Sequence, residues 1–396
     1  MERVEHNRWA VLGALVLGYI AVYLGRKNLA VAIPLLEEHF HASKATVGAI
    51  ESVGTITYAI GKILGGIVVD RAGGRTGFLA SLLGVALFTA LTGLAPSLGW
   101  IVVLYAANRT FGAGTWGSML KLLPSWFTGP RVATAIAVLS LSYVLGGACA
   151  TMLARSMVPF GYRAIFAAPV VPILVVALVT ARLVRPGPHA TPSGDRQKVE
   201  PAAYLGLLRN RTLLLACGIS FVTTLLREAF NTWSVHFLTQ ANGGTRALAV
   251  AAMQSTGFDI AGALGILAMG AAYTRLGPRR GLWLMVASLG LLAPAIWVLR
   301  LVGTQPIAAA AVLALVGFLL LGPFSLLGGL LSLDAGGPRM AATAAGLTDG
   351  VGYVASALAG AGLGRMLDHG GYDLALAILA ALALVAALLA SRLRLA

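Results

Sequence analysis

The sequence predicts an all-α polytopic membrane protein with twelve transmembrane helices in two pseudo-symmetric six-helix bundles. The first observation is composition: 58% of the 396 residues are hydrophobic and only 11% are charged, against about 25% charged in soluble domains. The second is that apolar runs of about 20 residues, long enough to cross a bilayer, recur along the whole chain. The third is a proline-rich polar stretch that separates six such runs from six others.

The first apolar run begins directly after a short charged N-terminus, and no small-residue cleavage site follows it. We therefore expect a retained first helix rather than a signal peptide. The spans are expected at residues 9–34, 46–69, 76–95, 99–121, 132–156, 163–184, 212–238, 248–273, 281–301, 306–332, 340–363 and 372–391.

The polar stretch predicts the domain division: an N-terminal bundle at 1–184, a cytoplasmic linker at 185–205 and a C-terminal bundle at 206–396. The halves also repeat. Gly66–Arg75 follows the second span, and a related stretch, Gly270–Arg280, follows the eighth, 204 residues later. Parallel repeats of this kind are related by a pseudo-two-fold axis along the membrane normal.

The net charge of +15 is largely an orientation signal. Of the 29 Lys and Arg residues, 17 fall in segments that are cytoplasmic if the N-terminus is inside, six in outer segments and six within spans. This bias predicts cytoplasmic termini, in a bacterial inner membrane. Cys149 and Cys217 lie inside apolar runs and indicate neither a disulfide nor a metal site.

The six cations within spans carry the functional information, because a charge at bilayer depth is costly unless it faces a cavity or a partner. They are Arg26, Lys27, Lys62, Arg109, Lys121 and Arg227. Arg26 and Arg227 are 201 residues apart in the first and seventh spans. We expect them to face each other across a central cavity, with Tyr19 and Tyr23 on the helix face of Arg26. Snorkelling to an interface is the alternative for Arg26 and Lys62, and it is the behaviour that we expect of Lys121 at the cytoplasmic end of its span.

Two opposed guanidinium groups and an ammonium predict an anion site, because a guanidinium offers forked donors that match carboxylate or phosphate. A dianion would neutralise the cluster and draw the two halves together. The alternative is that the arginines pair with Glu51, Glu228 or Asp259 and serve packing only. Glu51 lies near the outer end, and Glu228, next to Arg227, is not expected to share its helix face, which leaves Asp259 as the main competitor.

The stretch Gly66-x-x-x-Asp70-Arg71-x-Gly73-x-Arg75 resembles the loop signature of the major facilitator superfamily. Asp70 could cap or pair at the inner surface, so Asp70, Arg71 and Arg75 are candidates for a gating motif. Arg109, followed by Gly112 and Gly114, resembles a second motif of this superfamily, which implies either proton coupling or a structural role.

Further stretches, in order along the whole chain, resemble the organophosphate:phosphate antiporter family, which includes glycerol phosphate and hexose phosphate transporters. They are Tyr23-Leu-Gly-Arg26-Lys27-Asn28, Tyr58-Ala-Ile-Gly-Lys62, Leu225-Leu226-Arg227, Gly322-Pro323 and Ala344–Tyr353. The resemblance implies that Arg26 and Arg227 bind the phosphoryl group and that Lys62 assists. It also implies a cavity lined by Tyr19, Tyr23, Tyr58, Tyr353 and Trp116, with Asp259 in charge pairing.

The chain departs from the family pattern at three positions. Tyr143 stands where the family has a cavity histidine, and Thr224 and Leu321 stand where it has tyrosines. We expect Tyr143 to line the pocket instead. The cations to which the resemblance assigns phosphate binding are present, but some of the residues expected around them differ. The identity of the substrate and the role that the family's histidine has in coupling therefore stay open.

The function predicted from these features is secondary active transport of a small phosphorylated or phosphonate-type organic anion, by exchange with inorganic phosphate and alternating access. The alternatives are a proton-linked transporter of carboxylates or amphiphilic drugs, and a sugar-phosphate sensor that does not transport. Because the chain lacks a P-loop, a metal-ligand spacing and a nucleophile triad, we expect no enzyme activity, no cofactor and no nucleic-acid partner. We expect a monomer in the lipid bilayer.

Overall fold

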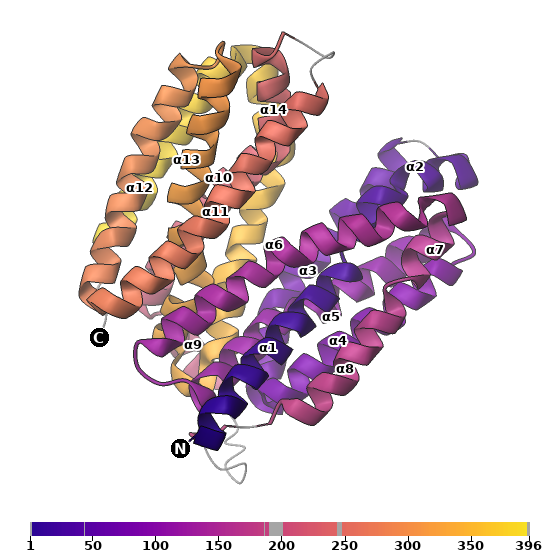
Figure 1. The fold of residues 1–396 in the computed structure, drawn as a ribbon, viewed down its shortest axis with the longest axis vertical. Helices are drawn as coiled ribbons and strands as arrows, with labels where there is room; N and C mark the ends of the chain where they lie inside the picture. Colours follow the sequence, from indigo (N-terminus) through magenta and orange to yellow (C-terminus); the bar gives the residue numbers. More distant parts are fainter. Residues whose placement is uncertain (1, 43, 186, 190–200, 244–247, 394–396) are drawn as a thin grey trace. The chain divides into compact units, whose positions relative to one another are not determined.

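The computed structural model describes residues 2–42, 44–185, 187–189, 201–243 and 248–393, and the elements in these ranges are helical (Figure 1). Most of the expected linker, residues 186 and 190–200, lies outside the described part. The described residues group into two compact units. The first comprises Met1–Tyr204 together with Gly336–Gly350, and the second comprises Leu205–Ala335 and Val351–Ala396. The continuous part of the first unit ends at Tyr204, and the stretch Gly336–Gly350, which was expected in the C-terminal bundle, packs with the first unit.

The first unit is built from α1 to α8 and the beginning of α9, and in it α3 and α4 pack on α5 and α1 packs on α6 and α8. The elements are α1 (Glu2–Leu24), α2 (Asn28–Phe40), α3 (Lys44–Ala72), α4 (Gly74–Leu94), α5 (Leu98–Trp126), α6 (Arg131–Met157), η1 (Val158–Phe160), α7 (Tyr162–Ala167), α8 (Val170–Leu183) and α9 (Pro201–Leu207).

The second unit packs α13 against α11 and α12, and α10 against α11. Its elements are α10 (Arg211–Ala241), α11 (Leu248–Leu276), α12 (Pro278–Leu301), α13 (Pro306–Leu326), the π-helical turn η3 (Leu327–Leu331) and most of α14 (Ser332–Ser391). Pro323 cannot donate to the carbonyl of Leu319 four residues earlier, and the Ser288 hydroxyl of α12 donates to that carbonyl instead, at 2.8 Å.

Ten helical segments within the described residues are long and apolar enough to span a membrane. The two expected spans that are not among these ten are 99–121, which lies in α5, and 340–363, which lies in α14. Both are helical. Each carries charged or polar side chains in its middle, such as Arg109 in α5 and Asp349 in α14.

The expected first span, 9–34, is interrupted at residues 25–27, between α1 and α2. Gly25 packs so tightly that an added Cβ would lie 2.7 Å from Oγ1 of Thr89 on α4. The carbonyls that the interruption leaves without a helical partner are bonded by side chains: Thr89 donates to the Gly25 carbonyl at 3.4 Å, and Tyr105 donates to the Arg26 carbonyl at 3.3 Å. Irregular backbone at membrane depth is tolerated where protein groups satisfy it in this way.

The last two expected spans belong to the single element α14, which is 60 residues long. Two glycines within it, Gly337 (φ 57°) and Gly371 (φ 62°), have left-handed backbone conformations. Because a right-handed helix requires a negative φ, the chain is bent at both positions. The stretch between them includes all but the first of the residues Gly336–Gly350, which pack with the first unit.

Candidate functional site

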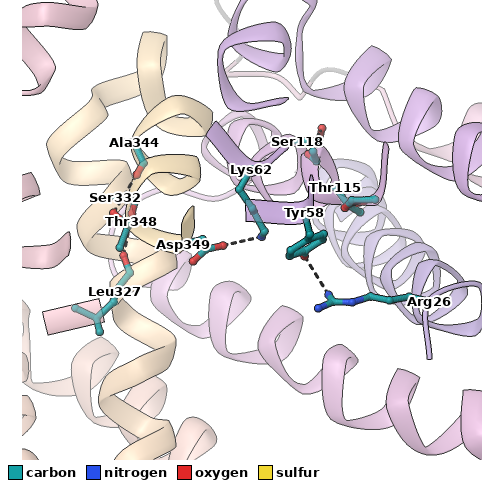
Figure 2. A network of polar contacts seen from close by, with 12 residues as sticks. Arg26, Tyr58, Lys62, Thr115, Ser118, Leu327, Ser332, Ala344, Thr348 and Asp349 are labelled. Atoms are coloured by element: carbon teal, nitrogen blue, oxygen red, sulfur yellow. Dashed lines mark hydrogen bonds and ion pairs between the residues drawn. The ribbon is translucent and has the colours of Figure 1, made fainter. Parts of the chain in front are cut away.

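Arg26 occupies the interruption between α1 and α2 instead of the helix face that the sequence predicted. Its Nη1 atom donates to the Tyr58 hydroxyl of α3 at 3.0 Å (Figure 2). The same atom of Arg26 lies 3.5 Å from the Tyr23 hydroxyl. Its guanidinium carbon lies 4.3 Å from the centre of the Tyr58 ring and 5.1 Å from that of Tyr23. Arg26 and Tyr23 lie close together, as expected, but Arg26 does not continue the helix that carries Tyr23.

The Tyr58 ring is surrounded by three cations of the first unit. The Arg26 and Arg109 guanidinium carbons lie 4.3 and 4.5 Å from the ring centre, and Nζ of Lys62 lies 5.3 Å from it. Tyr58 is 2% exposed. Attraction between a cation and an aromatic face is strongest where water is excluded. The ring therefore offsets part of the repulsion among the three positive charges and holds them in one place.

Lys62 forms an ion pair that the sequence did not predict, because Nζ of Lys62 lies 2.7 Å from Oδ2 of Asp349 (Figure 2). Asp349 belongs to the stretch of α14 that packs with the first unit. The Lys62 side chain is 4% exposed and that of Asp349 is 17% exposed, so snorkelling does not describe Lys62. An acid near the middle of an expected span, inside the quoted stretch Ala344–Tyr353, was the available signal for Asp349.

Arg109 lies on α5 and is 4% exposed. Besides Tyr58, its guanidinium lies 5.9 Å from the ring centre of Tyr105, whose single hydroxyl hydrogen is shared between Oε2 of Glu51 at 2.9 Å and the Arg26 carbonyl at 3.3 Å. The Nε atom of Arg109 has no hydrogen-bond partner among the described residues. The three cations and the two acids, Glu51 and Asp349, leave this cluster with one net positive charge. Glu51, an alternative partner of Arg26, accepts from Tyr105.

The predicted aromatic lining of the first unit is partly assembled around α1. The Tyr19 ring lies 5.3 Å from that of Tyr23 and 5.7 Å from that of Trp116 on α5. These three residues are buried. Tyr143 lies half-buried on α6. An added Cβ at Gly146, one turn further along α6, would lie 2.7 Å from Cβ of Tyr23, so α6 and α1 are in close contact here.

Asn28, the first residue of α2, is 1% exposed, and neither its side-chain nitrogen nor its side-chain oxygen has a hydrogen-bond partner among the described residues. Asparagine at a helix start usually accepts from a backbone N–H of the first turn. A buried amide left unsatisfied costs about 1–3 kcal/mol. The unsatisfied amide lies two residues after Arg26, directly after the interruption between α1 and α2.

In the second unit, Arg227 lies on α10 and pairs with its neighbour Glu228. The Nε and Nη2 atoms of Arg227 lie 3.0 and 2.5 Å from Oε1 of Glu228, and its guanidinium carbon lies 4.5 Å from the ring centre of Phe324 on α13. Glu228 was not expected to be a partner of Arg227 because the two do not share a helix face, and that expectation was wrong. Adjacent residues diverge on a helix, but both side chains are long enough to meet beside it.

Asp259 is exposed on α11, and Tyr353 is half-buried on α14.

Two of the departures from the family pattern, Thr224 and Leu321, lie at close-packed helix contacts of this unit. An added Cβ at Gly352 would lie 2.5 Å from Oγ1 of Thr224, and one at Gly262 would lie 2.2 Å from Cδ1 of Leu321. Arg26 and Arg227 belong to different units, so their approach across a cavity stays a prediction.

The second unit also holds a small apolar cavity of about 20 Å³ between α10, α12, α13 and α14, lined by residues such as Trp233, Phe237 and Leu376. The lining contains none of the predicted site residues. Because it is almost entirely hydrocarbon, this cavity does not suit a phosphate group.

The candidate gating motif has divided roles. Asp70 accepts hydrogen bonds from the backbone N–H groups of Ala342 and Thr343 at 3.3 and 2.7 Å and from the Thr343 hydroxyl at 2.6 Å. It also pairs with Nζ of Lys121 at 2.8 Å, a partner that the snorkelling expected of Lys121 did not include. Asp70 thus both caps and pairs within the first unit.

The two arginines of this motif differ from Asp70. Arg75 donates at 2.8 Å to the carbonyls of Ala181 and Val184, at the C-terminal end of α8. These contacts satisfy carbonyls that a helix end leaves without partners. Arg71 is exposed.

Comparison with known proteins identifies the family. A sequence profile of the Major Facilitator Superfamily matches residues 15–360. The chain belongs to the major facilitator superfamily. The superfamily fold is also seen in a crystal structure of FucP in the outward conformation, which has a TM-score of 0.73, is 13% identical, and is matched over 96% of this chain and 99% of that one.

Two curated relatives are similar to this superfamily member over nearly its whole length. A probable hexose phosphate transport protein of Chlamydia trachomatis is 26% identical over 98% of this chain and 91% of its own length. The membrane sensor protein UhpC of Escherichia coli is 25% identical over 92% of this chain and 87% of its own length.

Proposed function

We propose that this superfamily member is a secondary active transporter of a small organic anion that carries a phosphate or phosphonate group, working by alternating access and by exchange with inorganic phosphate. The observation that carries the proposal is the cluster of Arg26, Lys62 and Arg109 around one buried tyrosine. Buried cations in a membrane protein are costly and mark substrate pathways. The hexose phosphate relative supports a phosphorylated substrate.

In this proposal, Arg26 and Arg227 bind the anionic head and Lys62 supports them, while Tyr19, Tyr23, Tyr58, Trp116, Tyr143 and Tyr353 shape the rest of the pocket. A guanidinium fork can donate two parallel hydrogen bonds to phosphoryl oxygens. The bound dianion would compensate the net positive charge of the cluster. We also propose that both termini lie in the cytoplasm, which the excess of Lys and Arg in the segments on the side of the N-terminus supports, and that the membrane is a bacterial inner membrane, which the bacterial relatives support.

The test is counterflow of labelled phosphate into proteoliposomes loaded with phosphate. Wild type should exchange phosphate, and Arg26→Ala and Arg227→Ala should reduce the rate at least a hundredfold. Arg155→Ala removes an exposed arginine at the end of α6 and should leave the rate unchanged. Absence of phosphate flux in a folded wild type would rule out the proposed exchange.

A sugar-phosphate sensor is the second candidate, and the similarity to UhpC favours it. A sensor would bind sugar phosphate without moving it. Equilibrium binding to the purified protein, measured beside counterflow on the same preparation, separates the two functions. Saturable binding without flux would support the sensor.

A further inference from the structure

The ion pair between Lys62 and Asp349 is held in place by the backbones of two helices. Gly346 lies three residues before Asp349, and an added Cβ there would lie 2.1 Å from the Lys62 carbonyl oxygen. An added Cβ at Gly350 would lie 2.9 Å from a side-chain carbon of Ile63. Two glycines therefore bring α14 against α3 at this level, and the carboxylate reaches the ammonium because the helices are so close (Figure 2).

Packing alone does not explain why this contact is charged. A glycine seam already holds the two helices together, and an ion pair buried at such a contact contributes little more stability than apolar side chains of similar size. Lys62 also lies one helical turn from Tyr58, whose ring it shares with Arg26 and Arg109. The carboxylate of Asp349 is thus a negative group bound within the cation cluster.

We propose that Asp349 is an internal counter-anion, which occupies Lys62 while the site is empty and gives it up to the phosphate group of the bound anion. This inference rests on the proposed function. A lysine ammonium has three N–H donors and attracts any nearby anion, so a carboxylate and a phosphoryl group compete for it. Because both competitors are negative, binding of the phosphoryl group at Lys62 also repels the Asp349 carboxylate.

The competition gives the bound anion a mechanical effect within the first unit. The stretch Gly336–Gly350 of α14 is attached to α3 at two acids: Asp349 binds Lys62, and Asp70 of α3 binds the backbone and hydroxyl of Thr343. An anion at Lys62 weakens the first attachment and leaves the second in place. Binding of the anion therefore loosens the part of α14 next to Asp349 from α3.

The proposal predicts the sign of an affinity change. Asp349→Asn removes the competing charge, and the purified full-length protein in lipid nanodiscs should bind inorganic phosphate about tenfold more tightly. Asp349→Glu keeps the charge and should lie closer to wild type. The matched control is Asp373→Asn, because Asp373 forms an ion pair of similar length, 2.8 Å, with Arg300, but its side chain is 73% exposed. This control should bind phosphate as wild type does.

A second measurement needs no substitution. Hydrogen–deuterium exchange of the wild-type protein with and without phosphate should show faster exchange in peptides around residue 349 when phosphate is present, and little change around residue 343.

The outcomes separate the inference from the function on which it rests. If wild type binds phosphate but Asp349→Asn binds it equally or more weakly, and exchange near residue 349 does not rise, Asp349 is a structural partner of Lys62. That result overturns the inference and leaves the proposed function intact. If wild type binds no phosphate although it is folded, the proposed function fails and the inference fails with it.

Discussion

Removing the Tyr58 ring should weaken anion binding far more than removing its hydroxyl. Tyr58→Leu eliminates an aromatic face that lies 4.3, 4.5 and 5.3 Å from three cationic groups. At about 0.5–1 kcal/mol for each contact, the ring contributes about 2 kcal/mol to holding the cations together. An anion that binds without the ring must gather them itself, so we expect its Kd to rise about thirtyfold.

Tyr58→Phe tests the same site with the ring left in place. It removes only the hydroxyl that accepts from Arg26 at 3.0 Å, and the freed guanidinium donor remains available to a phosphoryl oxygen. We expect less than a threefold change in Kd. Both variants would be measured by equilibrium binding of labelled phosphate to protein in nanodiscs, with the apparent Tm as a control for folding. Equal Kd values for Tyr58→Leu and Tyr58→Phe would refute the idea that the ring organises the cations.

Three further predictions concern packing and charge. Gly25→Ala should lower the apparent Tm, because the new methyl would meet Thr89 at 2.7 Å, whereas Gly147→Ala, with no atom within 4 Å of the new methyl, should leave it unchanged or raise it; equal shifts would contradict the tight packing. Asp70→Asn should lower the apparent Tm more than Asp373→Asn, because Asp70 is buried and its charge faces a lysine; a similar loss in both would show that burial adds nothing. Glu228→Gln should retain phosphate counterflow, since it leaves the neighbouring arginine charged; complete loss would make Glu228 itself essential.

Much of the fold could be predicted because hydropathy and repeat spacing are properties of whole segments. The family and the all-helical architecture follow from apolar runs, a linker and a loop signature, and both are confirmed. The interruption at residues 25–27 could not be predicted, because Gly25 and Arg26 sit inside an apolar run that reads as one helix. What stabilises the interruption are side chains of Thr89 and Tyr105, more than sixty residues away in the chain.

Individual charge partners were predicted less well than the charged positions themselves. Burial cost is enough to single out Lys62, Arg109 and Arg227 from the sequence, because each cation stands in an apolar run. Their partners depend on which helices touch. Asp349 is 287 residues from Lys62, and no local pattern links the two. Glu228 was set aside by a helix-face argument that ignores the length of the arginine side chain.

Several energetically unfavourable features of this chain lie close to Arg26. A helix is interrupted there, the Asn28 amide is buried without a hydrogen bond, and Nε of Arg109 is buried without one among the described residues. Each of these features costs stability, and a sequence selected for packing alone would remove them. A bound anion would be attracted to the same groups, since guanidinium and amide N–H donors suit phosphoryl oxygens. The concentration of unmet donors beside a cluster with net positive charge is therefore a physical reason, independent of the relatives, to expect that the first unit supplies part of the site for the anion head.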